Sequence, residues 1–193
     1  MAGRRSDARQ KMVVAARQLI REQGYHATAL SDVLQLSDAP RGSVYFHFPG
    51  GKAELAVAAA EQHAREQVAQ IDQAARESTS AVDLVRAYVD MARQNLVASD
   101  YRQGCTLAPL VIEAGRDATE LGDIGSRAFT MIIDALAGHF TAFGLEPAAA
   151  RHLAGAAVAG AEGALVTARA LRSPTPFADV SAVLENQVAT LLA

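Results

Sequence analysis

The segment from Arg41 to Lys52, RGSVYFHFPGGK, concentrates side chains that donate hydrogen bonds or carry positive charge. Only Val44 and Phe48 have the spacing of a buried helical stripe, so the side chains between them must face another way. An arginine can pair with the edge of a guanine base, and a lysine or a hydroxyl group can hold a phosphate. The residue types therefore indicate contact with a polar, anionic partner.

Two short helices joined by a tight turn are predicted to position this segment. The apolar face of the first helix is formed by Leu30, Val33 and Leu34. Thr28 precedes that face as a suitable N-cap. Turn-forming residues occupy positions 36–39, and Pro40 is expected in the first turn of a second helix that ends at Pro49. Such a pair is typical of the helix-turn-helix, whose second helix enters the major groove of DNA.

A longer stretch, GYHATALSDVLQLSDAPRGSVYFHFPGGKAEL, resembles the DNA-binding segment of the TetR family of bacterial repressors. The shared features are the glycine-tyrosine start, the turn of small residues and the RGSVYFHF run followed by Lys52. Pro40 stands where most members have a capping serine, and Phe46 stands where tyrosine or histidine is usual. The pieces GCTLAPLVIEAG and AEGALVTARALRS resemble the regulatory domain of the LmrA/YxaF-like branch, which also carries APRGS and is associated with efflux-type resistance genes.

The resemblance implies roles for eight residues of the head. They are two base-reading residues, Arg41 and Ser43; a position of close backbone approach, Gly42; four phosphate contacts, Thr28, Tyr45, His47 and Lys52; and a thymine-methyl contact, Phe46. Without the resemblance, the same segment is also compatible with a small helical hairpin that has a solvated polar face.

Charge is unevenly distributed along the chain. The 193 residues include 18 Lys/Arg and 21 Asp/Glu, which gives a net charge of −3. Residues 1–52 contain eight basic and four acidic residues, a net charge of +4, and the rest contains ten and seventeen, a net charge of −7. A basic reading head on an acidic body has this distribution. Arg4 and Arg5 form either a DNA-contacting arm or a solvated terminus.

Helical periodicity recurs along the chain, and no strand-like alternation is visible. The sequence therefore predicts an all-α protein of about nine helices, with a three-helix helix-turn-helix head and a C-terminal helical regulatory and dimerisation domain. Outside the helix pair described above, helices are expected over residues 6–24, 52–76, 81–98, 105–114, 117–143, 147–172 and from 177 onward. We divide the chain into a DNA-binding domain, 1–52, and a ligand-binding and dimerisation domain, 53–193.

No recognisable catalytic arrangement is present. The sequence lacks HExxH, paired-cysteine, GxxxxGK[ST] and GxSxG motifs. None of the five histidines has an acidic residue three positions before it, as a carboxylate-bridged metal bundle requires. The single cysteine, Cys105, is either a nucleophile at a helix start or a structural thiol. We expect no catalytic residue, metal or cofactor; the alternatives to a regulator are a helical enzyme and an adaptor that binds only protein.

No membrane span is expected. The most apolar long stretch, 153–171, is mostly alanine and glycine and contains Glu162 and Arg169. The N-terminal residues lack an apolar segment after their basic side chains, so they do not resemble a secretory signal. A cytoplasmic location is the expectation.

Two helices near the C-terminus are predicted to form a homodimer interface. Ala156, Gly160 and Ala164 are small enough to allow another helix to come close. The last helix carries an apolar stripe of Phe177, Val180, Leu184, Val188 and Leu191. Both sets would pack either across a two-fold axis or within one chain.

An effector site is predicted among the larger side chains of the body, which could equally be ordinary core. These residues are Tyr88, Met91, Leu107, Phe129, Ile133, Phe140 and Glu162. A largely apolar site with one acid favours a small hydrophobic or aromatic effector. Together with the resemblance, this predicts a ligand-responsive repressor that binds a palindromic double-stranded DNA operator as a dimer and is released by its effector.

Overall fold

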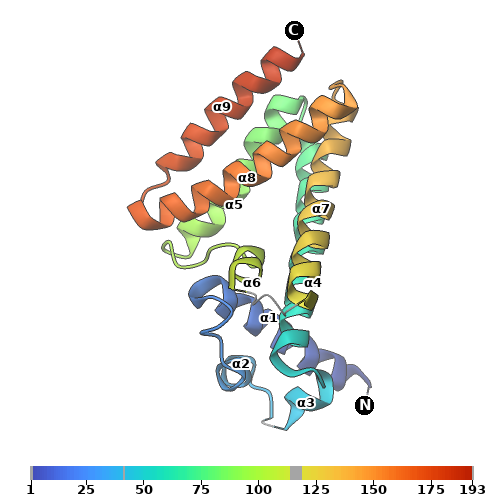
Figure 1. Cartoon of the computed structure of the whole chain (residues 1–193), viewed down its shortest axis with the longest axis vertical. Helices are drawn as coiled ribbons and strands as arrows, with labels where there is room; N and C mark the ends of the chain where they lie inside the picture. The colour runs from blue at the N-terminus through green and yellow to red at the C-terminus, as the bar shows by residue number, and fades with distance from the viewer. Residues whose placement is uncertain (1, 41, 114–118, 193) are drawn as a thin grey trace. The chain divides into compact units, whose positions relative to one another are not determined.

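The computed structural model describes residues 2–40, 42–113 and 119–192, and this part of the chain contains nine α-helices and no strand (Figure 1). The helices are α1 (Ala2–Gln23), α2 (Leu30–Ser37), α3 (Ser43–His47), α4 (Gly51–Glu77), α5 (Ala81–Ala98), α6 (Leu107–Glu113), α7 (Thr119–Ala142), α8 (Pro147–Leu171) and α9 (Thr175–Leu191). The predicted all-α class is confirmed.

Local sequence signals account for most helix ends. Ser80 caps α5 because its hydroxyl accepts a hydrogen bond from the Asp83 amide at 3.1 Å. The Glu146 carboxylate accepts from the first amides of α8, and Pro147 fits the start of that helix without losing a bond. Gly24 ends α1 with a φ of 89°, a left-handed conformation that glycine adopts without a steric penalty.

Two local predictions in the helix-turn-helix are wrong. Ala29 is the N-cap of α2, and it provides no side-chain cap, whereas Thr28 belongs to the preceding loop. Pro40 lies outside α3, because the Ser43 amide donates to the Pro40 carbonyl at 2.9 Å and closes a turn there. The helix therefore begins at Ser43 and is shorter than expected.

Packing divides the chain into two compact units. Unit 1 comprises Met1–His63 and Cys105–Ala128, and unit 2 comprises Ala64–Gly104 and Phe129–Ala193. The helices α4 and α7 each contribute to both units. These units of packing differ from the division of function that we place at residue 52, which stays a prediction.

The core of unit 1 holds the four N-terminal helices together. Its buried members are Met12, Val13, Ala15, Ala16, Val33, Val44, Phe48, Leu55, Ala58 and Ala59. On α1, Met12 and Ile20 are almost completely buried. Burial of Val44 and Phe48 fixes the rotation of the five-residue helix α3, whose own hydrogen bonds are too few to hold it.

In unit 2, α9 packs against α5 and α8. The stripe predicted to form the dimer interface lies largely inside the chain, since Phe177, Leu184 and Val188 are buried. The small residues of α8 also serve this internal contact: a side chain at Gly160 would lie 2.9 Å from Val180. Ala156 and Leu191 are exposed, so both helices also keep a surface outside this internal contact, and the prediction of a dimer interface on them stays a prediction.

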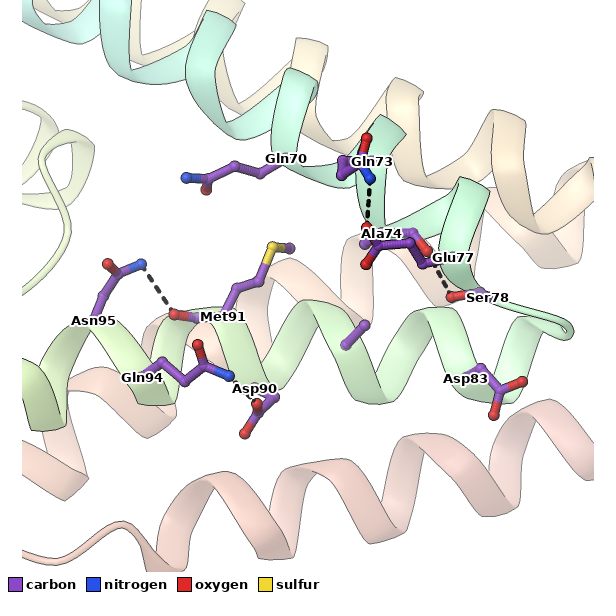
Figure 2. A pocket seen from close by; sticks show the side chains of 11 residues that line it. Gln70, Gln73, Ala74, Glu77, Ser78, Asp83, Asp90, Met91, Gln94 and Asn95 are labelled. Carbon is purple, nitrogen blue, oxygen red and sulfur yellow. Dashed lines mark hydrogen bonds between the residues drawn. The ribbon is translucent and has the colours of Figure 1, made fainter.

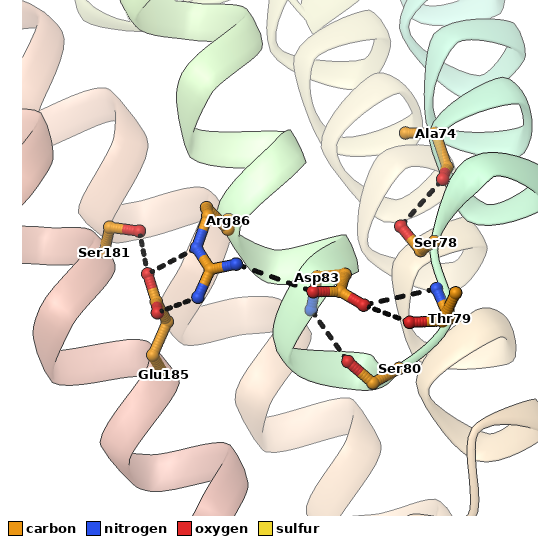
Figure 3. A network of polar contacts seen from close by, with 8 residues as sticks. All are labelled: Ala74, Ser78, Thr79, Ser80, Asp83, Arg86, Ser181 and Glu185. Atoms are coloured by element: carbon orange, nitrogen blue, oxygen red, sulfur yellow. Dashed lines mark hydrogen bonds and ion pairs between the residues drawn. The ribbon is translucent and has the colours of Figure 1, made fainter.

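A polar network links α5 to its neighbours in unit 2 (Figure 3). The guanidinium of Arg86 donates to Glu185 of α9 at 2.6 Å, and it lies 3.5 Å from Asp83. Asp83 in turn accepts from the hydroxyl of Thr79 at 2.6 Å. These contacts hold the start of α5 between the end of α4 and the middle of α9.

Candidate nucleic-acid interface and regulatory region

The exposed face of α3 is a candidate nucleic-acid interface. Val44 and Phe48 are 1% and 0% exposed, whereas the adjacent Tyr45 and Phe46 are 66% and 64% exposed. Apolar side chains that gather on an exposed surface mark sites where a protein binds another molecule. The alternation of buried and exposed residues on one short helix therefore indicates a surface that binds something.

The other predicted contacts of α3 lie on or beside this surface. Gly42 is exposed, and no atom lies within 4 Å of the position that a side chain would take there. The Ser43 hydroxyl donates to the Pro40 carbonyl at 2.6 Å but is partly accessible. The imidazole of His47 packs edge-on against Phe46, with ring centres 5.0 Å apart. Arg41, the predicted base reader, lies outside the described residues.

Thr28 is the exception among the predicted phosphate contacts. Its side chain is buried, with 3% of the residue exposed, and its hydroxyl donates to the Gly24 carbonyl at 2.7 Å. The hydroxyl therefore closes the loop between α1 and α2. Because it is buried and its hydrogen is already donated, it is not placed to contact a phosphate.

Lys52, near the start of α4, makes contacts within unit 1. Its ammonium donates to the His26 carbonyl at 3.0 Å and lies 4.5 Å from the centre of the Tyr25 ring. Partial burial lowers the pKa of Lys52 below its usual value, and the negative charge of Glu113 partly offsets this. An ammonium has three N–H donors, so these contacts leave donors for a phosphate.

The loop between α1 and α2 also belongs to the site, which the sequence did not predict. Its His26 amide donates to the Glu113 carboxylate at 2.6 Å, across 87 positions of sequence. One local signal was available: Glu113 is the last residue of α6, where an acidic side chain opposes the helix dipole. Such a residue needs a compensating partner, but the sequence does not say which partner that is.

The predicted effector residues are placed unevenly. Leu107 belongs to unit 1, and the other six belong to unit 2. Leu107 and Phe140 are fully buried, Tyr88 is 8% exposed, and Met91, Phe129, Ile133 and Glu162 are partly accessible.

A groove of about 540 Å³ lies between α4 and α5 in unit 2 (Figure 2). Met91, one of the seven predicted effector residues, points from α5 toward Gln70 and Gln73 of α4. The remaining lining residues are mostly amides and carboxylates, and no lysine or arginine is among them. This groove is therefore more polar than the predicted site.

Metal sites and membrane spans are both absent from the part of the chain that the structure describes. No group of three or more His, Cys, Asp or Glu side chains is arranged to hold a metal ion there. Within the same residues, none of the helices has the length and apolar character needed to cross a membrane.

A short helix with an exposed face, supported on a core shared by α1, α2 and α4, is the head of a helix-turn-helix DNA-binding protein. Residues 13–59 match the family described as bacterial regulatory proteins, tetR family. Residues 81–183 match the C-terminal domain described as transcriptional regulator LmrA/YxaF-like. The chain belongs to the TetR family of transcriptional regulators.

Individual relatives agree with this assignment, and a solved structure shares the fold. The chain is 42% identical over 183 residues to an uncharacterized HTH-type transcriptional regulator of Mycobacterium tuberculosis, and the match covers 92% of each chain. It is 49% identical to the regulator LmrA of Bacillus subtilis over 53 residues, or 28% of each chain. The fold resembles a regulatory protein TetR from Rhodobacter sphaeroides with a TM-score of 0.83 at 23% identity, covering 93% of this chain and 98% of that one.

Proposed function

We propose that this protein is a ligand-responsive transcriptional repressor that binds a palindromic operator as a homodimer. The observation that carries the proposal is the exposed aromatic pair Tyr45 and Phe46 on a helix whose opposite face is completely buried. In this reading, Arg41 and Ser43 read base edges, Gly42 allows close approach, and Tyr45, His47 and Lys52 hold phosphates. Phe46 contacts a thymine methyl.

The dimer would form through the outer faces of α8 and α9. Exposed residues recur at helical spacing on both helices: Ala156, Ala159, Gly163, Val166 and Ala170 on α8, and Ala182, Val183, Asn186 and Ala189 on α9. Val166 and Val183 are 68% and 69% exposed, so the pair of helices presents an apolar surface. A two-fold axis through this surface would supply two heads for the two halves of a palindrome.

The effector would be a small hydrophobic or aromatic molecule. Partial exposure of Phe129 and Ile133 on α7 leaves apolar surface that a ligand can cover, and Glu162 is partly accessible as well. Met91 gives the α4–α5 groove its one large apolar side chain. An effector that binds differently to two arrangements of the body shifts the equilibrium between DNA-bound and free protein.

The test is selection of duplexes from a random pool by the wild-type protein, followed by titration of the selected duplex and a scrambled one. Arg41→Ala should reduce discrimination between them by about 1–3 kcal/mol, as expected for loss of a bidentate contact to guanine. Equal weakening on both duplexes would remove Arg41 from the base-reading set. Failure of the wild-type protein to select any duplex would refute the proposed function.

A further inference from the structure

We propose that Glu113 is a positioning residue for DNA binding: its carboxylate fixes the loop between α1 and α2, and this loop holds Lys52 where it meets a phosphate. The inference rests on the proposed function and deepens it, since Glu113 lies in the stretch matched by the regulatory domain but packs in unit 1. It makes the end of α6 part of the DNA-binding head.

Glu113 holds His26 at two points. Its carboxylate accepts the His26 amide at 2.6 Å, and its own carbonyl oxygen lies 2.8 Å from Nε2 of the imidazole. A carbonyl oxygen only accepts hydrogen bonds, so Nε2 carries the proton in this contact. A hydrogen bond to a charged acceptor is stronger than a neutral one. Main chain and side chain of His26 are thus both anchored to the end of α6.

His26 is also hydrogen-bonded to Lys52. The His26 carbonyl accepts a hydrogen bond from the Lys52 ammonium, and the adjacent Tyr25 ring lies beneath that charge. Glu113 therefore accepts from the amide of His26, and Lys52 donates to the carbonyl of the same residue. If the loop is released from α6, the ammonium loses a fixed acceptor and its long side chain regains rotational freedom.

The loop is shaped to admit Glu113. Gly24 has a φ of 89°, and a side chain at this position would collide with the Glu113 carboxylate. The positive φ favours glycine at this position, and any other side chain would also push the end of the Glu113 side chain aside.

Two charge-matched variants separate positioning from charge. Glu113→Gln and Glu113→Ala both remove a negative charge near the DNA-binding surface, but only glutamine keeps an oxygen that accepts the His26 amide. On the selected duplex, we expect Glu113→Ala to bind about five- to tenfold more weakly than Glu113→Gln, the equivalent of one hydrogen bond. The slope of log affinity against log salt should also be shallower for Glu113→Ala than for Glu113→Gln, by about the amount expected for the loss of one phosphate contact.

The same pair is then compared in a Lys52→Ala background. If Glu113 acts through Lys52, the two variants should bind equally once the lysine is absent. A general structural role would leave their difference unchanged. Hydrogen exchange of the His26 amide, measured in the full-length chain, should be faster in Glu113→Ala than in Glu113→Gln.

Equal operator affinity for the two Glu113 variants, or a difference that persists undiminished without Lys52, would overturn the positioning role and leave the repressor proposal intact. If the wild-type protein selects no duplex, both proposals fail.

Discussion

The ammonium of Lys52 lies over the ring of Tyr25 and is hydrogen-bonded to the next residue of the same loop, His26. The positive charge that the sequence assigned to DNA is therefore held in place before DNA arrives. A preorganised side chain loses less conformational freedom on binding than one that is mobile in the free protein.

Lys52→Ala should weaken binding to the selected and scrambled duplexes by the same factor. A phosphate contact carries no sequence information, and its loss should reduce the slope of log affinity against log salt by about 1. Titrations at several salt concentrations provide the measurement. Arg151→Ala is the control, since Arg151 lies on α8 in unit 2. A lower slope in the control, or no change with Lys52→Ala, would contradict the role.

Gly24→Ala should destabilise the protein because alanine is strained at positive φ, at a cost of about 1–2 kcal/mol. The clash with Glu113 adds to this strain. Chemical unfolding of the two single variants and of the Gly24→Ala/Glu113→Ala double variant measures the coupling between the sites. We expect the glycine substitution to be less harmful when the carboxylate is absent. Strict additivity would mean that the two residues do not meet.

Val183→Glu should convert a dimer of about twice 20.3 kDa into monomers without loss of thermal stability, because Val183 is 69% exposed in the single chain. Leu184→Glu, one residue away, should instead lower the free energy of unfolding by about 3–5 kcal/mol, since it buries an uncompensated charge. Light scattering and thermal unfolding distinguish the two effects. A Val183→Glu protein that remains dimeric would place the interface elsewhere.

Phe140→Ala should lower the free energy of unfolding by about 3–5 kcal/mol, because this side chain is fully buried. It is therefore a poor probe of effector binding, whereas Met91→Ala alters an accessible groove residue. Mobility-shift release assays with hydrophobic aromatic compounds should show weaker release from Met91→Ala or Phe129→Ala at unchanged operator affinity. An unaltered response in both would exclude these residues from the effector site.

Stability in acid should depend on Glu185. Hydrogen bonds from Arg86 and then Ser181 lower the pKa of its carboxyl group below the usual value. A lowered pKa in the folded state stabilises the protein above the pKa of the unfolded chain, and this contribution disappears as the pH falls through the folded-state value. Glu185→Gln should therefore melt below wild type near pH 7, and the two melting curves should converge toward pH 3. A pH-independent difference would exclude the linkage.

The sequence predicted helix positions well because the signals are local. Ser80 and Pro147 each mark a helix start through a hydrogen bond or a backbone angle determined by neighbouring residues. The start of α3 was misplaced because Pro40 suits both a first helical turn and the tight turn that forms there. Local preferences alone do not separate these two conformations.

Long-range relationships were predicted less well. Periodicity correctly indicated that Phe177, Leu184 and Val188 are buried, but a stripe does not reveal whether its partner lies in the same chain. The contact of Glu113 with His26 depends on how distant helices pack, and no spacing in the sequence encodes it. The resemblance implied a phosphate contact for Thr28, but its hydroxyl instead donates to the Gly24 carbonyl four residues away and closes a loop.

The composition of unit 1 from two separated stretches has a consequence for building hybrid regulators. Joining residues 1–63 to the body of a relative would transplant α1, α2, α3 and the start of α4, but not Cys105–Ala128. Such a chimera would present the new loop between α1 and α2 to a foreign α6. If Glu113 positions Lys52 as we propose, full DNA affinity would transfer only when the recipient also received the partner segment, because unit 1 is discontinuous in sequence.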